Sequence, residues 1–275
     1  MMSRHVELYM KEAQKRELGT SRNTWTFVAG SIIILIIAFS CVALYLSRQP
    51  SDPASNSSSP LSTPRAAIVD QLSIHSLNQT FIDTVTSVLT QAGYEVDYYE
   101  WENVTIDFFR NLPTQDYALI ILRTHSGAVK AEPNYVCIFS SEIFSETKYR
   151  REWREGRVGK ARFLNDETYY FAITPAFVRY SMKGFFRNAT IIMMGCDGLA
   201  YPNMAKAFIK RGAKAYISWD GPVSTYHTDT ATCNLLNHLV TEEQPVPNAV
   251  AETMHETGSD PISNASLLFH PRKLN

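Results

Sequence analysis

The sequence predicts an α/β domain with a mostly parallel central sheet, preceded by one transmembrane helix. Two apolar runs, 118–122 and 191–194, are typical of buried parallel strands, and each ends in a short polar turn that contains glycine. Strand and helix patterns alternate from residue 66 onward. A third apolar run, 25–46, contains no charged residue.

The composition is that of a globular domain with a membrane segment attached. Of the 275 residues, 45% are hydrophobic and 19% are charged, and the formal net charge is -1. This near-neutral balance gives no support for a nucleic-acid partner. Nothing in the sequence indicates an oligomeric state.

The run 25–46 is long enough to cross a bilayer, for which roughly 20 apolar residues suffice. Trp25 and Tyr45 suit the two membrane interfaces. A cleaved signal peptide is the alternative, but its apolar core is usually only ~7–15 residues long and a small-residue cleavage site follows it. The basic residues on the N-terminal side are Lys11, Lys15, Arg16 and Arg22, against Arg48 alone on the other side. We therefore expect a single-pass type II membrane protein with a cytoplasmic N-terminus.

The remaining chain divides into a cytoplasmic tail (1–24), a Ser/Pro-rich linker (47–65) and an extracytoplasmic domain (66–275). Asn-x-Ser/Thr sequons on the outer side permit glycosylation. They lie at Asn56, Asn78, Asn103, Asn188 and Asn264.

Short strands and helices are predicted from the start of the domain onward. Hydrophobic spacing predicts a strand over 66–72, a helix over 80–91 that stops at Gly93, a strand over 94–99, a helix over 106–111 and a strand over 118–124. After the second key strand, it predicts a helix over 202–211, a strand over 215–219, helices over 225–240 and 248–257, and a last strand over 266–269.

An insert, 128–188, separates the two key strands. We expect strands at 135–139 and 169–173. The stretch 147–162 is dense in Lys and Arg, which is most often a solvated face; a loop cleaved during activation is the alternative.

His125 follows the strand 118–124, and Cys196 follows the strand that starts at residue 191. If these strands are parallel neighbours, both side chains leave the sheet at the same edge, where α/β folds bind ligands. A histidine beside a thiol can accept its proton and later protonate a leaving group. Backbone N–H groups near Gly127 and at Cys196 can form an oxyanion hole. Gly195 and Gly198 flank the cysteine, and they either contribute to this oxyanion hole or are ordinary turn residues.

Other candidate residues have less support. His75 follows the first strand and is a weaker candidate for a substrate contact. Outside the membrane segment the cysteines are Cys137, Cys196 and Cys233, so at most one internal disulfide forms. We expect it to join Cys137 to Cys233, although all three can equally be buried free thiols. The spacing predicts no metal site and no nucleotide loop, and we expect no cofactor.

The order strand, His-Ser-Gly, insert, strand, Gly-Cys-Asp-Gly, helix resembles that of the caspase-like cysteine peptidases of clan CD, most of all the gingipain-type and CHAT-domain branches. The segments 207–219 and 248–252 fit the same pattern. The resemblance covers residue 66 to the C-terminus. It implies a three-layer α/β/α sandwich and a thiol protease acting on protein or peptide substrates. It also implies that Cys196 is the nucleophile, His125 the general base and the Gly127 backbone an oxyanion donor.

Two positions depart from that family. Ser126 separates His125 from Gly127, and Met194 stands where some relatives carry an acidic specificity residue. Asp197 and Asp220 are the remaining candidates for an acidic specificity group, and each is equally suited to a turn.

Three hypotheses therefore remain open. The chain is a membrane-anchored cysteine endopeptidase, or an inactive caspase-like ectodomain that serves as an adhesion or receptor module, or a flavodoxin-like sensor of a small ligand.

Overall fold

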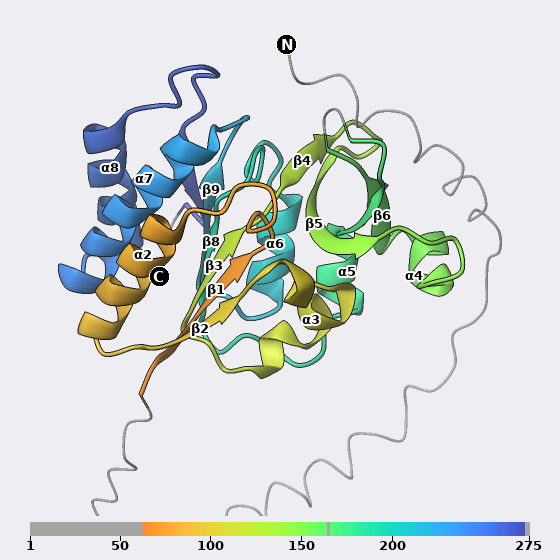
Figure 1. Cartoon of the computed structure of the whole chain (residues 1–275), viewed down its shortest axis with the longest axis horizontal. Helices are drawn as coiled ribbons and strands as arrows, with labels where there is room; N and C mark the ends of the chain where they lie inside the picture. The colour runs from red at the N-terminus through yellow and green to blue at the C-terminus, as the bar shows by residue number, and fades with distance from the viewer. Residues whose placement is uncertain (1–62, 164–165, 273–275) are drawn as a thin grey trace, which may run out of the picture. The chain divides into compact units, whose positions relative to one another are not determined.

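The computed structural model describes residues 63–163 and 166–272, which form a mixed α/β fold with two sheets (Figure 1). Sheet A has six strands in the order β10-β9-β8-β3-β1-β2, all parallel except β10. In chain order they are β1 (Arg65–Asp70), β2 (Glu95–Tyr99), β3 (Leu119–Arg123), β8 (Thr190–Met193), β9 (Ala215–Trp219) and β10 (Leu267–His270).

Helices cover both faces of sheet A because its central strands are apolar on both sides. In β3, Leu119 and Ile121 pack toward one face, while Ile120 and Leu122 pack toward the other. The first face carries α2 (Gln79–Gln91), α7 (Thr225–Leu236) and α8 (Val246–Thr257). The second carries α3 (Ile106–Asn111), α5 (Pro175–Tyr180) and α6 (Asn203–Lys210) (Figure 1).

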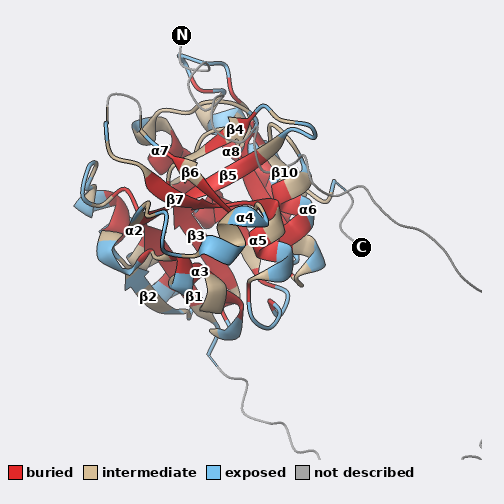
Figure 2. Cartoon of the chain, turned by 90° about the vertical axis from the view of Figure 1, so that its right-hand side faces the viewer, coloured by how far each residue is buried: buried red, intermediate tan, exposed pale blue. Residues whose placement is uncertain are grey.

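The insert folds into a separate antiparallel sheet, sheet B, with the order β4-β5-β7-β6. Its strands are β4 (Ser126–Val129), β5 (Tyr135–Ile143), β6 (Val158–Ala161) and β7 (Tyr170–Ile173). Val136, Ile138 and Phe171 join the core on the second face of sheet A. In Figure 2 these strands are buried, whereas α4 (Arg150–Arg154) lies at the surface.

Most elements predicted for the parallel sheet are confirmed to within about two residues. The predicted helix 225–240 ends at Leu236 and continues as one π-helical turn, Asn237–Thr241. The strand leading to Cys196 ends earlier than expected, at Met193. The two strands expected in the insert, 135–139 and 169–173, are confirmed as β5 and β7, although β5 continues to Ile143. β4, β6, α5 and the pairing of these strands into sheet B were not predicted. β4 and β6 have four residues each, and a Ser-Gly pair or a lysine interrupts their apolar pattern.

Several predictions concern residues that the structure does not describe. Within 63–163 and 166–272, no helix is long and apolar enough to span a membrane. The predicted transmembrane segment 25–46, the tail 1–24, most of the linker 47–65, and with them Cys41 and Asn56, lie outside the described residues.

Candidate active site

The segments that carry the predicted nucleophile and base lie side by side. β3 pairs in parallel with β8, with Leu122 opposite Met193, so the chain leaves both strands at the carboxyl edge of sheet A. Beyond the strands, the hydroxyl of Ser126 donates to the carbonyl oxygen of Cys196 at 2.5 Å. The sequence prediction that His125 and Cys196 leave the sheet at a shared edge is confirmed.

Gly195 is required at this contact. A Cβ atom there would lie 2.3 Å from the Thr124 carbonyl oxygen and 2.4 Å from the Ser126 hydroxyl, which no side chain tolerates. Gly198 has a similar role, since its Cβ would lie 2.0 Å from the Ser218 hydroxyl on β9. Both glycines therefore allow close packing of neighbouring segments.

The imidazole of His125 lies in an aromatic cluster. Its ring centroid is 4.5 Å from that of Phe163 and 6.0 Å from that of Phe139. The backbone N–H of His125 donates to Oε1 of Gln71 at 2.9 Å, which fixes the main chain. Burial, together with the charges of His75 and Arg123, lowers the pKa of His125 to about 4. The ring is therefore neutral at neutral pH.

His75, the weaker candidate of the sequence, belongs to the same cluster. Its exposed ring meets Trp101 edge-on at 5.0 Å and Phe163 at 5.4 Å. His75 and His125 therefore contact the same Phe163 ring.

The thiol of Cys196 is held by the backbone of Val223. Sγ accepts the Val223 N–H at 3.4 Å and lies 3.6 Å from the Val223 carbonyl oxygen. Burial raises the pKa of Cys196, and nearby Asp197 and Asp260 add to the rise. Within the described residues, no hydrogen bond joins this thiol to His125. The resting site therefore holds a neutral thiol and a neutral imidazole.

The register of β4 decides which backbone groups face the cysteine. His125 lies opposite Phe139 in the register of β4 and β5, and Phe139 donates its N–H to the His125 carbonyl. These two residues therefore form a hydrogen-bonded pair, as opposed to a non-hydrogen-bonded one, of an antiparallel ladder. By alternation, Gly127 and its partner Cys137 form a pair of the same class, and the Gly127 N–H faces β5. The geometry thus disfavours Gly127 as an oxyanion donor. The Ser126 N–H points away from β5, toward the side on which its hydroxyl meets Cys196.

Asp197 and Asp220 both serve turns. Asp197 has φ 60° and accepts the Ala128 N–H at 3.3 Å; burial, followed by repulsion from Asp220, raises the pKa of its carboxyl group despite that hydrogen bond. Asp220 accepts the Ser266 N–H at 2.8 Å, extending the contact of β9 with β10. Their role as specificity residues remains a prediction.

A buried ion-pair triad lies beneath the edge and was missed by the sequence analysis. Arg123, at the end of β3, is fully buried; Nη1 donates to Asp70 at 2.8 Å and Nε donates to Asp229 at 2.8 Å. Nη2 also donates to the Ser76 carbonyl at 2.9 Å. One guanidinium therefore connects β1, β3, α7 and the loop after β1. A charged residue inside an apolar strand was the only available signal.

Asp260 was missed as well. Its carboxylate accepts backbone N–H groups from Ser224, Ile262 and Ser263. Burial opposes ionisation, but these hydrogen bonds outweigh it and lower the pKa of Asp260 to about 2. Asp260 thereby binds the loop before β10 to the start of α7, next to Val223.

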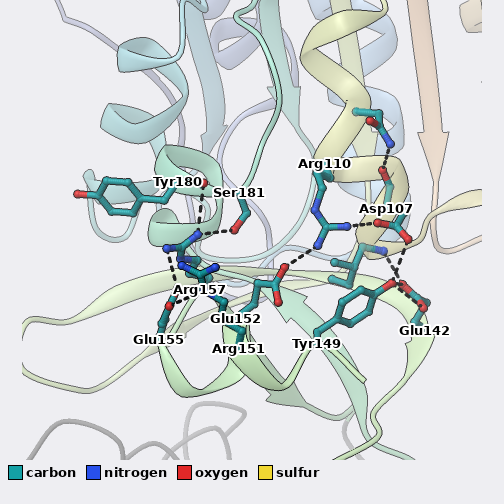
Figure 3. Close-up of polar contacts among 12 residues, drawn as sticks. Asp107, Arg110, Glu142, Tyr149, Arg151, Glu152, Glu155, Arg157, Tyr180 and Ser181 are labelled. Carbon is teal, nitrogen blue, oxygen red and sulfur yellow. Dashed lines mark hydrogen bonds and ion pairs between the residues drawn. The ribbon is translucent and has the colours of Figure 1, made fainter. Parts of the chain in front are cut away.

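The basic stretch 147–162 forms ion pairs within itself and with α3. Arg110 on α3 pairs with Glu152 at 2.9 Å and with Asp107, and Arg157 pairs with Glu155 at 2.6 Å (Figure 3). Tyr149 donates to Glu142 (Figure 3). This network favours the interpretation as a solvated face that attaches α4 to the domain. Cleavage of the segment during activation remains a prediction.

The disulfide expected between Cys137 and Cys233 is wrong, because Cys137, Cys196 and Cys233 are all free. Cys137 lies on β5 in the small core of sheet B, whereas Cys233 lies on α7 against the opposite face of sheet A. Among the described residues, no group of three or more His, Cys, Asp or Glu side chains can hold a metal ion.

Comparison with known proteins gives no assignment. No protein-family model matches this sequence, and no curated protein matches it.

Proposed function

We propose that the chain is a membrane-anchored, caspase-like cysteine endopeptidase whose catalytic domain faces the outside of the cell. Its substrates are proteins or peptides, Cys196 is the nucleophile and His125 is the base. One observation carries the proposal: a partly exposed thiol and a histidine follow two paired parallel strands at the carboxyl edge of sheet A, where ligands bind in open α/β sheets.

The reaction starts when a substrate carbonyl meets the thiol. The Cys196 proton passes to the neutral His125 ring as sulfur attacks the carbonyl carbon, and the C–N bond then breaks as His125 protonates the leaving amine. Water then attacks the resulting thioester as His125 accepts its proton, and the C–S bond breaks as His125 returns that proton to the Cys196 sulfur. The Ser126 and Cys196 backbone N–H groups are the proposed oxyanion donors, in place of Gly127.

The proposal requires a movement within the site. The His125 ring lies against Phe163, and the thiol is held by Val223, so the ring has to turn toward Cys196 when substrate enters. Catalytic hydrogen bonds are often long or absent in unliganded enzymes and form in the substrate complex.

The environment of the Cys196 thiol favours a second candidate, an inactive ectodomain that binds a protein partner. A thiol with a raised pKa that contacts only backbone groups is typical of a structural cysteine. In that case, the shared edge is a binding surface without chemistry.

Peptide hydrolysis distinguishes the two candidates. The purified full chain is incubated with a peptide library, and new termini are identified by mass spectrometry. We expect Cys196→Ser and His125→Ala each to lower the rate at least ~100-fold, as loss of a nucleophile or base does. Cys233→Ser, which changes a half-buried thiol on α7 away from Cys196, is the matched control and should retain activity. Cleavage that persists in Cys196→Ser would exclude Cys196 as the nucleophile.

A further inference from the structure

Exposed apolar side chains gather at the carboxyl edge of sheet A. Ile74 and Leu77, in the loop after β1, are 58% and 62% exposed. Tyr226, in the first turn of α7, is 81% exposed, and Ile262, in the loop before β10, is 84% exposed. We call these four residues the apolar rim. Single exposed apolar residues are ordinary, but several at one candidate site indicate a binding surface.

Two members of the apolar rim, Tyr226 and Ile262, belong to segments that are fixed near the thiol. Val223 contacts Cys196, and the Ser224 N–H that follows it donates to Oδ2 of Asp260 at 2.9 Å. The other oxygen of Asp260 accepts the Ile262 N–H at 3.0 Å. A single carboxylate therefore fixes Ile262 beside the segment that runs from Val223 to Tyr226.

The loop after β1 is attached to the same helix. The side-chain amide of Asn78 donates to Asp229 at 2.9 Å, and Asp229 lies one turn after Tyr226 on α7. Leu77 directly precedes Asn78, so it lies near the N-terminal end of α7. Leu77 and Ile262 thus lie beside the start of α7, which carries Tyr226, whereas Ile74 lies earlier in the loop after β1.

The charge of the segments that carry Tyr226 and Ile262 indicates which kind of ligand side chain fits there. The segments 221–228 and 261–266 contain no Asp, Glu, Lys or Arg. His227, which lies in the first of these segments, packs on Trp219 at 5.2 Å, and its Nε2 atom lies 3.2 Å from the Gly258 carbonyl. Asp260 lies between these segments, but its carboxylate already accepts the backbone N–H groups of Ser224, Ile262 and Ser263. A charged substrate side chain would therefore lose water here with little ionic compensation, whereas an apolar one would gain by burial.

We propose that the apolar rim binds an apolar side chain, such as that of leucine or phenylalanine, in a peptide whose reacting carbonyl lies at Cys196. The proposal rests on the peptidase function proposed above and gives its substrate class. Tyr226 and Ile262 are then specificity-determining residues.

The test uses peptidyl acyloxymethyl ketones that differ only in one side chain, which is Leu, Phe, Ser, Lys or Asp, at each of the two positions nearest the reactive group. Second-order labelling rates of Cys196 are measured on the full chain by intact-mass spectrometry. We expect the Leu or Phe probe to react at least ~10-fold faster than the Lys and Asp probes at one position. The double variant Tyr226→Ser/Ile262→Ser should reduce that advantage to less than ~3-fold. Tyr180→Ser, which removes a 66% exposed tyrosine on α5, is the matched control and should keep the preference.

Alkylation by iodoacetamide, which needs no subsite, is measured in parallel and should be equal in all variants. A Lys or Asp preference, equal rates for all probes, or a preference unchanged in the double variant would overturn the role of the apolar rim while leaving the peptidase function in place. If iodoacetamide alkylates Cys196 but no peptidyl probe does, the peptidase function itself fails.

Discussion

The environment of His125 sets the pKa of its imidazole, which can be measured. Phe163 and Phe139 exclude water from its ring, and burial is the main cause of its low pKa. Since the proposed reaction needs the neutral imidazole, hydrolysis should stay active on acidification until the pH falls through the value of about 4.

Phe163→Ala tests this cause. Removing the ring admits water to the imidazole, so the pKa of His125 should rise from about 4 toward its ordinary value, near ~6.5. An NMR titration of the His125 ring protons measures the shift independently of activity. Phe185→Ala, which removes a 65% exposed ring elsewhere, should leave the titration unchanged. An unaltered His125 titration in Phe163→Ala would refute burial by this cluster as the cause.

The sequons differ in how far their side chains are available. Asn78 caps α2 through Oδ1 and donates its amide to Asp229, so its nitrogen is occupied by the fold. Asn103, Asn188 and Asn264 are exposed. On expression through a secretory pathway, we expect glycans on these three residues and none on Asn78. Peptide mapping after enzymatic deglycosylation reads each site separately, and a glycan on Asn78 would contradict the observed contacts.

At the scale of elements, Arg123 holds three segments of the candidate site together. Arg123→Met would leave two buried carboxylates, Asp70 and Asp229, without their cation, which typically costs about 3–5 kcal/mol of unfolding free energy. Urea denaturation followed by fluorescence measures the loss. The control is Arg187→Ala, because the pair of Arg187 with Asp116 is exposed and such pairs contribute about 0–1 kcal/mol.

A compensated variant separates charge from packing in this triad. Arg123→Met combined with Asp70→Asn and Asp229→Asn removes both stranded charges, so it should recover part of the stability lost in Arg123→Met. If the triple variant is no more stable than the single one, the loss is due to packing around the guanidinium rather than to unpaired charge.

The loop before β10 should respond to acid through Asp260. Its folded-state pKa of about 2 lies below the ordinary value of ~3.9, so its contribution to stability is present above ~3.9 and is lost as the pH falls through about 2. Asp260→Asn should therefore melt at a lower temperature than the unmodified chain at pH 7, and the two melting temperatures should approach each other near pH 2. A constant difference across this range would exclude the carboxylate charge as the cause.

Elements of sheet A were predictable from sequence because a central parallel strand is buried on both faces. Its sequence is then a continuous apolar run, as in 118–122, and a polar turn marks where it ends. Within sheet B, β6 lacked such a signal: it lies inside the basic stretch, where Lys160 interrupts a strand of four residues. Tertiary pairing with β7, not local pattern, makes it a strand.

The site was predictable only in part for a similar reason. His125 and Cys196 were found because each follows a recognisable strand. Val223 and Phe163 contact them, and Asp260 acts on Cys196 through its charge, all from segments distant in the sequence. No local pattern connects a backbone amide, a carboxylate or an aromatic ring to a residue elsewhere in the chain.

In the described part of the molecule as a whole, loops from several strands meet at the carboxyl edge of sheet A. β1, β3, β8 and β9 all run in the same direction, so the loops that follow them meet there, and β10 starts from the same side because it is antiparallel to β9. Sheet B begins directly after His125, so the insert adds Phe139 and Phe163 to this edge. The architecture therefore brings together a thiol, an imidazole and an apolar surface.

The most direct test of the proposed pairing is a crystal structure of the full chain bound to a leucine-containing peptidyl aldehyde, which forms a reversible hemithioacetal with an active cysteine. The account predicts a bond from the aldehyde carbon to Sγ of Cys196, the aldehyde oxygen near the Ser126 N–H, and the His125 ring turned from Phe163 to within about 4 Å of the sulfur. An adduct at Cys196 with the His125 ring still against Phe163, or no adduct at this thiol, would contradict it.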